Sequence, residues 1–217
     1  PVTAIAVKYV NGDIYVFGCG DYIVKGKERY TKCVDEYNLL KFFLKLWEQK
    51  CPDILTGWNT KFFDIPYLVN RMRKILGPEE TKKLSPWNLI SEREAYVMNR
   101  KMTVYELVGI GDFDYLELYK WYSPSGKSQE SYRLDNIANV EIGEKKLDYS
   151  EYDSLHQLYR LDFQKFIEYN IKDVELILRL DDKLKLLELG ITLAYEDRKS
   201  TRLNSSHVSE SRMPSSA

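Results

Sequence analysis

The pattern that most restricts the fold is a pair of alternating apolar runs near the start of the chain. Residues 2–10 ("VTAIAVKYV") and residues 13–18 ("DIYVFG") show the two-residue alternation that is typical of strands. Asn11 and Gly12 separate the two runs, and both residue types tolerate the positive φ angles of a tight turn. The sequence therefore predicts an antiparallel hairpin in this part of the chain.

Two amphipathic helices with a strand between them follow the hairpin. Residues 36–50 ("EYNLLKFFLKLWEQK") repeat apolar side chains at helical spacing after Asp35, which suits the N-cap position. Residues 53–58 are predicted to form a short strand. A second helix is predicted over residues 64–76, because Gly77 and a proline end its apolar pattern.

The remaining chain continues this alternation of strands and helices. The predicted elements are a hairpin over 92–108 that turns near Asn99-Arg100, a strand at 110–116, a helix at 116–122, a small helix at 131–140 and a long helix within 161–189. Initial hairpin strands followed by alternating helices and strands predict an α/β fold, in which helices cover the faces of a mixed sheet.

Composition narrows the functional classes. A 217-residue chain with 44% hydrophobic residues can bury a substantial core, and it contains no apolar run long enough to span a membrane. The three cysteines show no paired spacing, and two histidines make an imidazole-based metal site improbable. The 33 acidic residues favour oxygen ligands and therefore hard cations.

A change in composition marks a boundary near residue 197. Residues 198–217 contain seven serines against eight in the preceding 197 positions, and they resemble the translated read-through of sequencing-adapter DNA. We expect residues 1–197 to form the folded domain, truncated at its N-terminal side, and residues 198–217 to be a non-native or disordered tail. Without the tail, 28 basic and 32 acidic side chains give a net charge of −4, so any nucleic-acid contact must be local.

Two polar residues interrupt the apolar stretch "TGWNTKFFDIPYLVNR", residues 56–71. Asn59 and Asp64 lie at the predicted junction between a strand and a helix, close to Phe63. An aspartate at such a junction is commonly only an N-cap residue. The alternative is that the carboxylate of Asp64 belongs to a functional site.

A second polar pair lies in the long helix near the end of the folded part. Tyr169 and Asp173 are four residues apart, so a helix presents them on one face. A hydrogen bond between a tyrosine and an aspartate on a partly buried face would explain them without any catalytic role. The two motifs together, Asn-x-x-x-Phe-Asp followed by Tyr-x-x-x-Asp, favour the hypothesis that both pairs belong to one functional site.

In that order the two motifs resemble the second and third exonuclease motifs of family B DNA polymerases, especially the bacteriophage-type members. The resemblance extends over most of residues 1–197, including "LWEQKCPDILTGWNTKFFDIPYLVNR", "FDYLELYKWY" and "EYNIKDVELI". It implies the ribonuclease H-like fold of DEDDy-type 3′–5′ exonucleases. The family's first motif, an Asp-x-Glu pair on the strand before the hairpin, has no counterpart here.

The resemblance also implies a mechanism. Hydrolysis of the 3′-terminal phosphodiester uses two divalent cations, Mg²⁺ or Mn²⁺, about 3.5–4 Å apart between carboxylates. Asp64 and Asp173 would be metal ligands, and Tyr169 would orient the attacking water. Asn59 and Phe63 would hold the frayed DNA end, where stacking on an unpaired base contributes ~1–3 kcal/mol.

By this resemblance the chain is a fragment of a DNA-directed DNA polymerase with proofreading activity. The implied partners are a primer-template, a single-stranded 3′ end, and the sliding clamp and replisome proteins, with no membrane; the implied location is the cytoplasm, of a host cell if the source is viral. Because the first acidic motif is absent, we expect the fragment itself to be inactive. A stand-alone exonuclease and a noncatalytic nucleic-acid module of the same fold remain alternatives.

The implied fold makes a geometric prediction. Its first strand is central, so residues 2–10 and 53–58 would flank the place of a strand that this fragment does not contain. The two segments would then stand about two strand spacings apart, about 9–10 Å, or have collapsed together, without direct and regular pairing. Each would present an unpaired backbone edge to the same gap.

Overall fold

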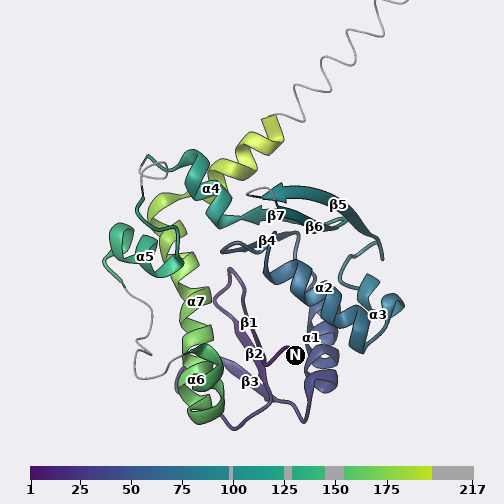
Figure 1. The fold of residues 1–217 in the computed structure, drawn as a ribbon. Helices are drawn as coiled ribbons and strands as arrows, with labels where there is room; N and C mark the ends of the chain where they lie inside the picture. Colours follow the sequence, from purple (N-terminus) through teal and green to yellow (C-terminus); the bar gives the residue numbers. More distant parts are fainter. Residues whose placement is uncertain (98–99, 125–128, 145–153, 197–217) are drawn as a thin grey trace, which may run out of the picture.

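The computed structural model describes residues 1–97, 100–124, 129–144 and 154–196 (Figure 1). Within these ranges strands and helices alternate in the mixed α/β arrangement that the sequence predicts. The described strands form three small sheets, and the strands at residues 2–10 and 53–58 belong to different ones. The predicted tail, residues 198–217, lies outside the described residues.

The first sheet contains the predicted hairpin and one strand that the sequence did not reveal. Strand β1 (Ala4–Lys8) pairs antiparallel with β2 (Ile14–Gly18), and Gly12 has the positive φ of 92° that the turn requires. Strand β3 (Arg29–Lys32) pairs parallel with β2. Its sequence, "RYTK", is short and polar, which explains why no strand was predicted there.

Helix α1 (Glu36–Gln49) confirms the first helical prediction, including its cap. The Asp35 carboxylate accepts a hydrogen bond from the backbone amide of Asn38 at 2.8 Å. One face of the helix packs into the core. Its buried side chains are Leu39, Leu40, Phe43, Leu44 and Trp47.

The second sheet places the loop before α2 beside the start of α4. Strand β4 (Ile54–Gly57) pairs parallel with β7 (Gly111–Asp114), in a register that places Gly57 opposite Asp114. Helix α2 (Asp64–Ile75) follows β4 and helix α4 (Tyr115–Tyr122) follows β7. Since the strands run in the same direction, both connections to helices leave from the same edge of this sheet.

The third sheet is a long hairpin held against α2. Strands β5 (Ile90–Val97) and β6 (Arg100–Leu107) confirm the predicted hairpin, although the turn residues 98–99 lie outside the described part. The Tyr105 hydroxyl donates to the side-chain oxygen of Asn70 on α2 at 2.8 Å. The short helix α3 (Pro78–Lys82), which was not predicted, connects α2 to this hairpin.

After β7 the described chain contains helices and no strand. The small predicted helix begins three residues later than expected, as α5 (Leu134–Ile142), and α6 (Leu155–Leu161) was not predicted. The long helix is confirmed as α7 (Phe163–Leu184). Lys185 then adopts a left-handed conformation, with φ 54°, and residues 186–196 are helical again.

Three apolar clusters make up the core of the described part of the chain. One joins the first sheet to α1 and α2 and includes Phe43 and Met72. Another packs α4 and α5 on α7 around Tyr115. The third lies between the sheet and helices α6 and α7, so the sheet stands between α1 on one side and α7 on the other (Figure 1). No helix in the described part is long and apolar enough to cross a bilayer.

Candidate active site

The connection from β4 to α2 carries three of the residues singled out in the sequence. Asn59 has a positive φ of 65°, which asparagine tolerates better than most residues. Phe63 is the N-cap residue of α2, and no side chain caps this helix. Asp64 is the first helical residue, so the interpretation of Asp64 as an N-cap is wrong. Its carboxylate needs another explanation.

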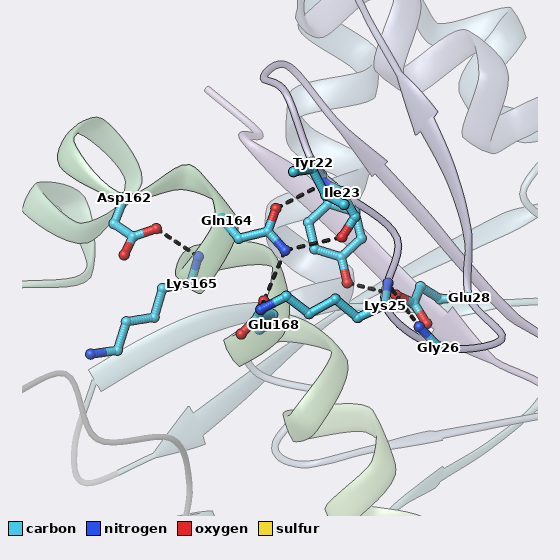
Figure 2. Close-up of polar contacts among 9 residues, drawn as sticks. All are labelled: Tyr22, Ile23, Lys25, Gly26, Glu28, Asp162, Gln164, Lys165 and Glu168. Atoms are coloured by element: carbon cyan, nitrogen blue, oxygen red, sulfur yellow. Dashed lines mark hydrogen bonds and ion pairs between the residues drawn. The ribbon is translucent and has the colours of Figure 1, made fainter.

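Helix α7 carries the other two residues, and its first turns are fixed to the loop between β2 and β3 (Figure 2). The side-chain oxygen of Gln164 accepts from the Ile23 amide at 2.8 Å, and its nitrogen donates to the Ile23 carbonyl at 3.0 Å. Glu168 forms an ion pair with Lys25 at 2.6 Å. These contacts fix the part of α7 directly before Tyr169, and Asp173 follows one turn later.

A buried carboxylate organises the loop itself. Glu28 is only 8% exposed, and one of its oxygens accepts from the Tyr22 hydroxyl at 2.6 Å and from the Lys25 and Gly26 amides (Figure 2). These hydrogen bonds hold the pKa of Glu28 below its usual value although burial opposes them. The start of α7 therefore binds to a loop that its own hydrogen bonds hold in place.

All five candidate residues line one cavity of about 2240 Å³. They come from segments far apart in the sequence: Asn59, Phe63 and Asp64 from the β4–α2 junction, Tyr169 and Asp173 from α7. Strands β1 and β4 also line this cavity, yet they belong to different sheets and do not pair in the described part of the chain. The predicted absence of direct pairing between these two strands is confirmed.

Burial and the acidic residues around the cavity raise the pKa of Asp64. Burial raises the pKa of Asp64 to about 6, and the negative charges of Asp114 and Asp173 add to this effect. The side chain is nevertheless accessible from the cavity. An accessible carboxylate surrounded by protein walls and other carboxylates is one that a cation would stabilise.

An exposed aromatic pair lies beside Asp64. The rings of Phe63 and Tyr67 are nearly parallel, with an interplanar angle of 9° and centroids 6.4 Å apart. They remain 64% and 44% exposed. Two exposed flat rings at the border of a cavity are suited to contact a planar ligand.

The metal-binding capacity of the described residues is incomplete. Asp64 and Asp173 supply hard oxygen donors to one cavity, which suits Mg²⁺ or Mn²⁺. The described ranges contain no group of three or more acidic, histidine or cysteine side chains that could hold a metal ion. Two carboxylates fit part of a two-ion site, and further ligands are needed to complete it.

The sequence did not draw attention to two aspartates on β7. The Asp112 side chain is exposed on one side, but the protein around it removes enough water to raise the pKa of Asp112 to about 6. Asp114 is buried and accepts several backbone hydrogen bonds. Lys61, in the loop before α2, forms an ion pair with Glu117 on α4 at 2.7 Å. The only signal was an aspartate between a strand and a helix in "GDFDYLEL", which is a common arrangement.

Comparisons with known proteins identify the family of this chain. Residues 8–137 match the family model described as DNA polymerase family B, exonuclease domain. The chain is 37% identical over 166 residues to a DNA-directed DNA polymerase of Escherichia phage RB69, and 33% identical over 166 residues to that of Enterobacteria phage T4. In both cases 76% of this chain aligns, and it spans 18% of the length of the relative. It is also 34% identical over 123 residues to a DNA polymerase catalytic subunit of Human herpesvirus 7, covering 54% of this chain and 12% of the relative.

Proposed function

Since this chain belongs to the exonuclease domains of family B DNA polymerases, we propose that it is the proofreading part of a longer DNA-directed DNA polymerase. In this role it hydrolyses the terminal phosphodiester at the 3′ end of DNA. Two observations carry the proposal. Asn59, Phe63, Asp64, Tyr169 and Asp173 all line one cavity, and within it the charge of Asp173 acts on the carboxylate of Asp64.

Each side chain has a role that follows from its chemistry. Asp64 and Asp173 would hold the divalent cations, Mg²⁺ or Mn²⁺. When bound, these ions supply positive charge that stabilises the attacking and leaving oxygens of the phosphodiester. Tyr169, one helical turn before Asp173, orients the attacking water through its hydroxyl.

The DNA end would be held at the β4–α2 junction. Phe63 is exposed beside Asp64, so its ring can stack on the terminal base while the carboxylate lies near the phosphate. Asn59 offers an amide group to the sugar or base at the same cavity. The proposed substrates are therefore the single-stranded 3′ end and the primer-template from which it separates.

The same cavity supports the ribonuclease H-like assignment. Strands β1 and β4 both line it without pairing in the described part of the chain. A strand of the longer protein placed between them would join the first two sheets into one mixed sheet with a central first strand. Such a strand could bring an Asp-x-Glu pair to Asp64 and Asp173 and complete the ligand set.

A direct consequence concerns this chain alone. Two carboxylates provide too few ligands for two cations, so we expect the 217-residue chain to remove no nucleotides from single-stranded 3′ ends in Mg²⁺. The longer polymerase should digest them. Metal-dependent digestion by the 217-residue chain, purified to homogeneity, would contradict the proposed ligand count.

The decisive experiment compares two aspartates on the same helix in the longer polymerase. Asp173→Ala should lower the rate of 3′ digestion of a labelled single strand by at least about 100-fold, because a ligand to the cation is lost. Asp182→Ala is the matched control, since its side chain is 81% exposed on α7. Equal digestion by the two variants would exclude the assignment, and DNA binding without digestion by the unsubstituted protein would favour a noncatalytic module.

A further inference from the structure

The carboxylate of Asp114 connects the start of α4 to the loop between β4 and α2. Asp114 ends β7 and is the N-cap residue of α4, where one oxygen accepts from the Leu116 and Glu117 amides at 3.0 and 3.4 Å. That oxygen also accepts from the Asn59 amide at 3.1 Å, and the other oxygen accepts from the Lys61 amide at 3.1 Å. One side chain thus binds four backbone amides.

Because Asp114 is buried, the loss of any of these hydrogen bonds is costly. Asp114 is 3% exposed, so water cannot replace a partner that is removed. Hydrogen bonds to a charged group in such surroundings are stronger than those between neutral groups. A helix cap alone would use only the Leu116 and Glu117 amides. The bonds to Asn59 and Lys61 therefore need a separate explanation.

The loop that Asp114 holds leads directly into the candidate site. Asn59 is in the left-handed region at φ 65°, a conformation that the surrounding contacts must maintain. From there the Phe63 amide donates to the Asn59 carbonyl at 3.1 Å, and the Ile65 amide donates to the Thr60 carbonyl at 2.9 Å. Any shift of residues 59–61 is therefore transmitted to the first turn of α2, where Asp64 lies.

A second contact also holds the β4–α2 loop against α4. The Lys61 side chain donates to both carboxylate oxygens of Glu117, at 2.9 and 2.7 Å. This ion pair is partly exposed and contributes modestly by itself. Together with the amide contacts, it fixes the β4–α2 loop to the first turn of α4 at two places.

We propose that Asp114 is a positioning residue of the exonuclease site: by holding the amides of Asn59 and Lys61, it sets where Asn59 and Asp64 stand. This inference rests on the proposed function for the identity of the reaction. The geometric part, that Asp114 keeps residues 59–61 in place, does not depend on it.

Two substitutions separate positioning from helix capping. Asp114→Ser keeps a residue that caps helices well but has too short a side chain to span to the β4–α2 loop. Asp114→Asn keeps the size of the side chain. If its oxygen stays with Leu116, Glu117 and Asn59, its amino group faces the Lys61 amide, and two donors then meet. The matched control is Asp112→Asn, an isosteric change on the same strand.

The first measurement is amide hydrogen exchange in the full 217-residue chain. Exchange at Asn59 and Lys61 should accelerate about tenfold in Asp114→Ser, while Leu116 and Glu117 change much less. In Asp114→Asn the acceleration should be largest at Lys61. Asp112→Asn should leave all four amides as they are. Unchanged exchange at both Asn59 and Lys61 in the two Asp114 variants would overturn the inference.

The second measurement uses the longer polymerase and the Mg²⁺ dependence of 3′ digestion. If Asp64 is displaced, the Mg²⁺ concentration for half-maximal digestion should rise about tenfold or more in both Asp114 variants, whereas nucleotide incorporation, which serves as the folding control, stays constant. Faster amide exchange with an unchanged Mg²⁺ requirement would refute a positioning role. A polymerase without any 3′ digestion would instead refute the proposed function, and the exchange measurement would still decide the structural part. Should Asp114→Ser fold poorly, the isosteric Asp114→Asn carries both measurements.

Discussion

Asp64 and Asp173 line the same cavity from two different helices, and the charge of Asp173 contributes to the raised pKa of Asp64. Burial makes the larger contribution. This relationship is tertiary in origin, because Asp64 and Asp173 are 109 positions apart in the sequence. Anything that shifts one helix relative to the other changes the electrostatic environment of both carboxylates.

The pH dependence of stability tests the titration of Asp112 on β7. Burial, with the charge of Asp114, raises the pKa of Asp112 from 3.8 to about 6. Between these values the folded chain binds a proton that the unfolded chain has released, so the contribution of Asp112 to stability falls as pH rises through this window.

Asp112→Asn should therefore unfold at higher urea concentration than the unsubstituted chain at pH 7, and the difference should vanish below about pH 4. The measurement is a series of urea midpoints from pH 3.5 to 7.5. A difference that does not vary with pH would show that the substitution acts through packing and not through the titration of this carboxyl group.

Removal of the contact between Gln164 and Ile23 should loosen the loop between β2 and β3. Gln164→Leu removes two hydrogen bonds to the backbone of Ile23 and one to Glu168, so unfolding should require about 1–2 kcal/mol less free energy. Trypsin should also cut faster after Lys25 in the freed loop. Gln49→Leu, at the exposed end of α1, is the matched control for adding a leucine to the surface. Equal trypsin rates for the two variants would show that Gln164 does not hold the loop.

Close packing between the same loop and α7 predicts non-additive mutations. A Cβ atom at Gly20 would lie 2.7 Å from ring atoms of Phe163, so Gly20→Ala should destabilise the chain by about 1–3 kcal/mol. Phe163→Ala removes that obstacle at the cost of lost packing. In the double variant the effect of Gly20→Ala should be much smaller than in the single variant, as measured by denaturant unfolding. Additive effects would mean that the backbone moves away from the ring.

Local patterns predicted the long elements well. Helices α1, α2 and α7 were predicted because their apolar residues recur at helical spacing, and the first hairpin because Asn11-Gly12 marks its turn. Strand β3 and helices α3 and α6 are too short to show such periodicity. They depend on neighbours that only the folded chain supplies.

The site was predictable only in part, for the same reason. The resemblance identified Asp64 and Asp173, and both line the cavity. Asp114 could not be singled out, because its importance comes from amides that are 53 and 55 positions away in the chain. A single aspartate between a strand and a helix suggests a cap, and nothing local in the sequence reveals that the same carboxylate also binds the β4–α2 loop.

The cavity between β1 and β4 also bears on how cooperatively the chain unfolds. The three apolar clusters share no buried residue, and the cavity lies among the elements that carry them. The unfolding of one cluster is then only weakly coupled to the unfolding of the others. The calorimetric enthalpy of unfolding should therefore exceed the van't Hoff enthalpy. A strand that fills the cavity and pairs with both β1 and β4 would join these units, and the two enthalpies should then converge. An enthalpy ratio of one for the 217-residue chain alone would show that the helices already couple the three clusters.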